Sequence, residues 1–99
     1  MKINETKAKK IIKSFNAKFP DLTVTRIYDC EEGTIVKAVT DPTKIKMGMP
    51  FYQVFPNGSV VNANPLGRHS FFTTVVQEEN MIYNNSDAVE PELPKIKSN

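Results

Sequence analysis

The chain carries at its middle the segment Phe51-Tyr-Gln-Val-Phe-Pro-Asn-Gly-Ser-Val-Val-Asn-Ala63, in which β-branched and aromatic residues flank a Pro-Asn-Gly turn. This pattern is typical of a β-hairpin. Pro56 presets φ for the first central residue of a type I turn, and Gly58 supplies the left-handed residue that forms a bulge. The segment therefore predicts a hairpin at the centre of a small antiparallel sheet.

Two registers are open for this hairpin. The bulged turn pairs Val54 with Val60 and Phe51 with Ala63, whereas a two-residue Asn-Gly turn pairs Phe55 with Val60. A shift of one residue moves every side chain of a strand to the other face of the sheet. We favour the bulged register because proline suits the first position of its turn.

A helix is predicted over residues 4–19, upstream of this hairpin. Its apolar residues recur at the spacing of one helix face. Asn4 is a suitable N-cap, with Ile3 and Ala8 placed as a hydrophobic staple, and Pro20 ends the helix. The residues of the apolar stripe are Ala8, Ile11, Ile12, Phe15 and Phe19.

A second hairpin is predicted between this helix and the central one. Residues 22–29 and 34–40 are rich in β-branched residues, and Cys30-Glu-Glu-Gly33 between them reads as a tight turn with glycine at a left-handed position. Residues 44–50 then form an irregular link. Long unassigned pieces of this kind often carry function.

Residues 70–84 allow two interpretations. Ser70 is a possible cap for a helix in which Phe71, Phe72 and Val75 share a face. The run of β-branched and aromatic residues over 70–76 favours a strand instead, with a second strand piece at 80–84. We adopt the strand.

These elements together predict an α+β fold, with the N-terminal helix packed on a four- or five-stranded antiparallel sheet. Ninety-nine residues suit one domain, which we place at residues 1–84. Residues 85–99 contain Pro91 and Pro94 and few apolar side chains, so we expect a disordered C-terminal tail.

The formal net charge is only +2, so the chain as a whole has no strong field toward nucleic acid or membrane. Residues 1–20 nevertheless carry six lysines and one glutamate, a charge of +5, which leaves −3 for the remainder. No apolar run is long enough to span a bilayer, and the N-terminus lacks the apolar core of a signal peptide. A cytoplasmic protein is expected.

Cys30 and His69 are the only cysteine and histidine of the chain. A nucleophilic cysteine needs a nearby base and an electropositive setting. Cys30 instead precedes Glu31-Glu32, whose charges disfavour the thiolate. One Cys and one His also fall short of a zinc site. We therefore expect no catalytic residue, no metal and no cofactor, and thus no enzyme.

Two groups of residues are candidate binding surfaces. The first is the lysine-rich face of the helix, formed by Lys7, Lys9, Lys10 and Lys13, which would suit phosphates or an acidic protein. The second is a partner-binding surface around the turn after the central hairpin, where cationic side chains adjoin two aromatic rings. Its residues are Arg68, His69, Phe71 and Phe72. Each group also has a plain structural explanation, as a solvated helix face and as a turn that leads into a strand.

The order helix, hairpin, link, hairpin resembles that of PepSY-type modules. The helix end at Phe19-Pro20-Asp21, followed by Thr23-Val24-Thr25, is similar to their opening. The strand pair Phe51-Tyr-Gln-Val54 and Asn57-Gly58-Ser-Val60 is similar to their closing motif, so the resemblance covers residues 5–62. It implies a cystatin-like sheet wrapped around one helix, in non-enzymatic domains associated with protease regulation and ligand binding. Residues 64–84 have no counterpart in it.

The function expected from these observations is a small non-enzymatic binding or regulatory protein, an adaptor or inhibitor that acts through a protein partner. The alternative is a nucleic-acid-associated protein that uses the lysine face.

Overall fold

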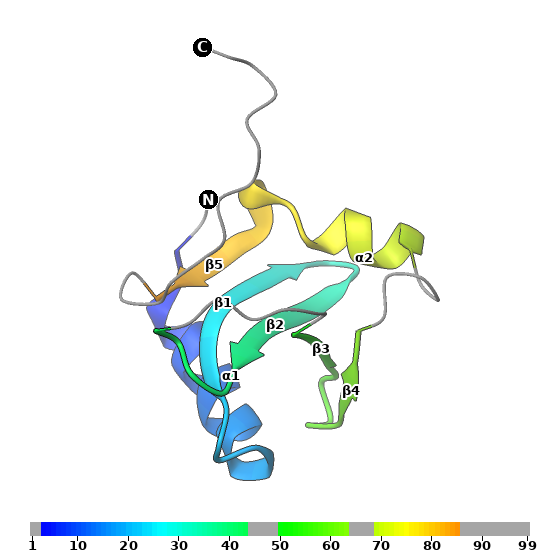
Figure 1. Ribbon diagram of the computed structural model, residues 1–99. Coiled ribbons are helices and arrows are strands. Elements are labelled where there is room, and N and C mark those ends of the chain that lie inside the picture. Colours follow the sequence, from blue (N-terminus) through cyan, green and yellow to red (C-terminus); the bar gives the residue numbers. More distant parts are fainter. Residues whose placement is uncertain (1–2, 44–49, 64–68, 86–99) are drawn as a thin grey trace.

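The computed structural model describes residues 3–43, 50–63 and 69–85 (Figure 1). Its strands form one antiparallel sheet in the order β4-β3-β2-β1-β5. The elements are α1 (Glu5–Lys18), β1 (Thr23–Cys30), β2 (Gly33–Val39), β3 (Phe51–Val54), β4 (Val60–Asn62), α2 (His69–Val75), the 3₁₀ turn η1 (Glu78–Asn80) and β5 (Met81–Asn84). The predicted α+β class, with the N-terminal helix on a five-stranded antiparallel sheet, is confirmed.

Helix α1 begins and ends where the sequence predicts. The Asn4 side chain accepts a hydrogen bond from the Lys7 backbone N–H (3.1 Å), which satisfies one of the free donors of the first turn. Phe19 is the C-cap, directly before Pro20. Phe15 is fully buried, and its ring and that of Phe19 lie 5.4 and 5.7 Å from the ring of Tyr52 on β3. These rings fix the C-terminal half of the helix against the sheet.

The predicted β3–β4 hairpin adopts the bulged register, but it lies at one edge of the sheet and not at its centre, because β2 is the middle strand. Val54 pairs with Val60, and the Ala63 N–H donates to the Phe51 carbonyl (2.9 Å). Gly58 has φ of +91° and donates its N–H to the Phe55 carbonyl (2.8 Å), closing the turn that proline begins. The other hairpin is confirmed as well, with Cys30 opposite Gly33 and only two glutamates between them. Gly33 has a positive φ of 156°, more extended than the left-handed geometry predicted.

The strand predicted for residues 70–76 is wrong, because His69–Val75 is the helix α2. Helical spacing lets Phe71, Phe72 and Val75 meet the face of the sheet that α1 leaves uncovered, and Val75 is fully buried there. Burial on that face outweighs the β-propensity of the individual residues. The second strand piece, predicted at 80–84, is confirmed as β5.

Two apolar clusters lie on the two faces of the sheet, because successive strand residues point to opposite sides. On β1, Ile27 belongs to the cluster under α1 and Tyr28 to the cluster under α2. On β2, Val36 and Ile35 divide in the same way. The sheet is thus the middle layer of the domain (Figure 1). The predicted link, except Pro50, and the predicted tail, except Asn85, lie outside the described residues.

Strand β5 lies beside the segment that precedes α1. It pairs with β1, and the Asn4 N–H donates to the Ile82 carbonyl on its outer side (3.0 Å). The start of α1 is therefore tied to the last strand. This connection positions the candidate site.

Candidate functional site

The predicted partner-binding residues lie at and before helix α2. Arg68 lies outside the described residues. His69 opens the helix, and only its backbone is described. The Phe72 ring meets the Phe51 ring edge to face, with centroids 5.1 Å apart. Phe71 and Phe72 are both partly buried in the cluster under α2, so their rings contribute to the packing of the domain itself. Their role in partner binding stays a prediction.

The predicted lysine face is divided by the structure. Lys7 Nζ lies 2.6 Å from Asp29 Oδ2 on β1, in an ion pair whose side chains are 50% and 16% exposed. Lys9, Lys10 and Lys13 are exposed and form no ion pair with any residue that the structure describes. The charge of Lys7 is therefore already matched within the fold, whereas three lysines offer their charge to solvent or to a partner.

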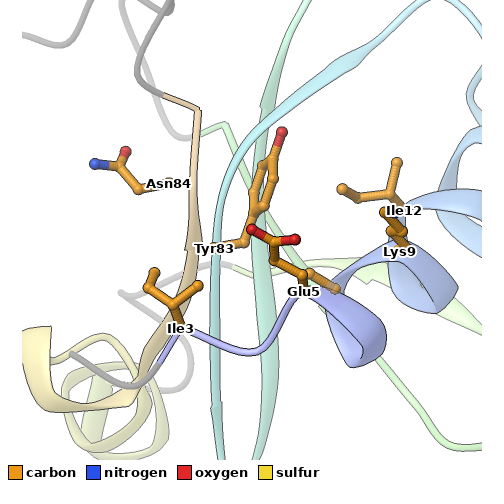
Figure 2. A pocket seen from close by; sticks show the side chains of 7 residues that line it. Ile3, Glu5, Lys9, Ile12, Tyr83 and Asn84 are labelled. Atoms are coloured by element: carbon orange, nitrogen blue, oxygen red, sulfur yellow. The ribbon is translucent and has the colours of Figure 1, made fainter.

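A hollow of about 180 Å³ lies between the first turns of α1 and strand β5 (Figure 2). Its lining is mainly apolar, with one carboxylate and one ammonium group beside it. We call it the α1–β5 hollow, and its lining residues are Ile3, Glu5, Ala8, Lys9, Ile12, Tyr83 and Asn84.

The local sequence explains how the hollow forms. Asn4 caps α1 and is hydrogen-bonded to Ile82, so Ile3 lies beside β5 rather than packed beneath the helix. In the view of Figure 2, the Tyr83 side chain extends from β5 and lies between Ile3 and Ile12. The predicted staple pair, Ile3 and Ala8, both line the hollow. Ile3 remains 53% exposed, so apolar surface is left open at this position.

Sequence reasoning placed Ile3 and Lys9 in local roles and did not identify Tyr83 or Asn84. Only the pairing of β5 with β1 and with the segment before α1 brings these residues together. Nothing in the spacing along the chain marks that contact. The one sequence feature that points to this surface is Ile3, the apolar residue directly before the N-cap Asn4.

Cys30 is an unfavourable nucleophile in this structure. Burial, together with the hydrogen bond that its Sγ donates to Glu32 Oε1 (3.2 Å), raises the pKa of the Cys30 thiol. A raised pKa reduces the thiolate fraction at neutral pH, and the thiolate is the reactive species. The distance from Cys30 to the His69 side chain lies outside what is described.

In the described ranges, no three His, Cys, Asp or Glu side chains are grouped so that they could hold a metal ion. Within the same ranges, neither α1 nor α2 is long and apolar enough to cross a membrane.

Comparison of the chain with models of protein families, with curated proteins and with solved structures found no match. The resemblance to PepSY-type modules stays a prediction.

Proposed function

We propose that this chain is a small non-enzymatic binding protein, an adaptor or inhibitor, and that it contacts a protein partner through the α1–β5 hollow. The observation that carries the proposal is the size and lining of the hollow. Pockets for free small-molecule ligands usually measure about 300–1,000 Å³. At about 180 Å³, the α1–β5 hollow suits a single apolar side chain.

The surroundings of the hollow fit the same role. Protein interfaces have an apolar centre with a polar rim, and a few buried anchor side chains supply most of the binding energy. Here Ile3 and Tyr83 would form the centre, and Lys9 would belong to the rim. We place the protein in the cytoplasm, and its resemblance to PepSY-type modules is consistent with a role in binding.

The test is affinity capture from a lysate of the source cells, treated with nuclease and read by mass spectrometry. The matched variants are Ile3→Ser and Val61→Ser, because these are the two large apolar side chains exposed among the described residues. Partners retained by the wild type and by Val61→Ser but lost with Ile3→Ser would support the proposal. If both variants retained the same proteins as the wild type, the hollow would not be the contact.

Nucleic-acid binding is the second candidate, favoured by the exposed Lys9, Lys10 and Lys13. Each phosphate contact would contribute roughly −0.7 to −0.9 to the slope of log affinity against log salt, so three contacts would give about −2 to −3. No aromatic residue lies between these lysines on the helix to stack on bases. We therefore expect little binding at physiological salt.

Fluorescence anisotropy with a mixed-sequence single strand and a duplex tests this alternative. The wild type is compared with a variant in which Lys7, Lys9, Lys10 and Lys13 are all changed to Gln. Submicromolar binding at physiological salt that is lost in this variant would replace the protein-binding proposal with the nucleic-acid one.

A further inference from the structure

We propose that the α1–β5 hollow receives an extended, acidic segment of the partner, which adds to the outer edge of β5 and inserts one apolar side chain into the hollow. This inference rests on the proposed function and specifies the chemistry of the partner. It draws on three observations: the direction of the backbone groups of β5, the side chains beside them, and the charge along α1.

The backbone of β5 is open at Asn84. The Asn85 N–H donates to the Thr25 carbonyl on β1 (2.8 Å), so the backbone N–H of Asn85 points toward β1. In an antiparallel pair this direction alternates from residue to residue, so the N–H and C=O of Asn84 point away from β1. The Ile82 carbonyl also points away from β1, and it accepts a hydrogen bond from the Asn4 N–H. No described residue hydrogen-bonds to the outward groups of Asn84, which leaves one donor and one acceptor for an added strand.

The hollow lies beside this open position, since Asn84 is itself one of its lining residues. A strand added at Asn84 would direct alternate side chains to the face of the sheet that carries α1. One of them would meet Ile3, Ile12 and Tyr83. Strand addition of this kind combines main-chain hydrogen bonds for affinity with a pocket for a side chain, which gives specificity.

The charge beside the hollow favours an acidic segment. Glu5, Lys9 and Lys13 follow one another at intervals of four residues, and such residues lie along one side of a helix. The row therefore carries two positive charges against one negative charge, and Lys10 adds another nearby. Lys7 is not available to the same degree because it is paired with Asp29. Complementary charge raises the association rate and suppresses wrong partners.

The probe is a random decapeptide display library selected on the full-length protein, with the enriched peptides then synthesised. We expect the enriched sequences to carry an excess of Asp and Glu around one large apolar residue. The double variant Lys9→Glu, Lys13→Glu should weaken the binding of these peptides about tenfold or more, mainly through the association rate. Enrichment without acidic bias, or peptides that bind this variant as well as the wild type, would overturn the inference.

A proline substitution tests strand addition separately from charge. Asn84→Pro removes the outward N–H without taking a hydrogen bond from β1, and edge strands tolerate proline at such positions. Asn62 is the matched control. It lies on β4 at the other edge, and its N–H also points outward because Ala63 donates to Phe51. We expect Asn84→Pro to lower peptide affinity by about tenfold, the effect of one lost hydrogen bond of about 1.4 kcal/mol, and Asn62→Pro to leave it within twofold.

Equal affinities of these two proline variants for the peptide would contradict strand addition. If Asn84→Pro failed to fold, the charge-reversal result would still decide the acidic character of the partner. A library that yields no binder, beside a lysate partner that depends on Ile3, would overturn only this inference, because the contact would then be made by a folded surface. If the library yields no binder and no lysate partner depends on Ile3, the proposed function is overturned as well.

Discussion

Gly33 lies where the tip of the first hairpin meets helix α2. A Cβ atom on this glycine would be 2.8 Å from Phe71 Cζ and 2.9 Å from Cε1, closer than real Cβ atoms approach a neighbour. Gly58 has a positive φ of +91°, but a Cβ there would meet only Ser14 Oγ at 4.0 Å. One glycine is thus required by both its conformation and the nearby ring, and the other by its conformation alone.

We therefore expect Gly58→Ala to reduce the free energy of unfolding by about 1–2 kcal/mol, the cost of an unfavourable φ. Gly33→Ala should cost more. The Phe71→Ala substitution removes the ring and should relieve part of that extra loss. The double-mutant cycle of Gly33→Ala with Phe71→Ala should therefore show a coupling free energy of about 0.5 kcal/mol or more. The same cycle made with Gly58→Ala should be additive. Urea unfolding of the wild type and the five variants measures both cycles, and equal coupling would refute this account of Gly33.

Cys30 gives a prediction about pH. Because burial and the Glu32 hydrogen bond raise the pKa of the thiol, the folded protein should react with iodoacetamide more slowly than the urea-unfolded chain at pH 7.5. The rate should reach half its maximum at a higher pH in the folded state. Glu32→Gln should shift this midpoint back toward that of the unfolded chain. Mass spectrometry of alkylation over a pH series measures these rates, and a lower midpoint in the folded protein would contradict the assignment.

At the scale of elements, helix α2 depends on a cap that comes from outside the helix. The buried Asn80 side chain donates to the carbonyls of Thr74 and Val75, both at 3.2 Å, and so satisfies acceptors that the end of a helix leaves free. The Gln77 side chain donates to the Thr73 carbonyl in the same way. The turn after α2 thus stabilises the helix that precedes it.

Asn80→Ala should lower the free energy of unfolding by about 1–3 kcal/mol, because it removes the two hydrogen bonds that this buried side chain donates to the end of α2. Asn62→Ala is the control on an exposed strand position, where we expect a change within about 0.5 kcal/mol. Chemical denaturation followed by circular dichroism compares the two variants. A loss no larger for Asn80→Ala than for Asn62→Ala would show that the cap is unimportant.

The elements that the sequence predicts correctly have local causes. The Asn4 cap and Pro20 bound α1, and the Pro-Asn-Gly turn determines the register of the central hairpin. Helix α2 was missed because its residues favour a strand locally, and only the uncovered face of the sheet selects the helix. The α1–β5 hollow was missed for a related reason, since β5 reaches its place through pairing with β1, far away in the sequence.

At the scale of the whole molecule, two apolar clusters and the sheet between them hold the described residues together. As described, both apolar clusters are built from residues between Ala8 and Tyr83, and the Asn85 N–H donates a backbone hydrogen bond to Thr25. Residues 86–99 contain Pro91 and Pro94 and few apolar side chains, so the sequence offers little apolar surface to offset the entropy cost of ordering them. We therefore expect the domain to keep its stability without that segment.

A chain that ends at Asn85 should melt within a few degrees of the full-length protein. Calorimetry of the two chains at equal concentration measures the difference. A drop of more than about 5 °C, equivalent to about 1 kcal/mol in a domain of this size, would show that residues 86–99 contribute to folded stability.

The central claim is that the surface between α1 and β5 contacts a protein. Site-specific photocrosslinking tests this claim most directly, with a benzophenone amino acid placed at position 3 in one variant and at position 61 in the other, in cells that make the protein. Both positions carry exposed apolar side chains, Ile3 at 53% and Val61 at 45%, but only Ile3 lines the hollow. The account predicts a discrete, nuclease-resistant protein adduct at position 3 and none at position 61. The absence of an adduct at position 3, or equal adducts at both positions, would contradict it.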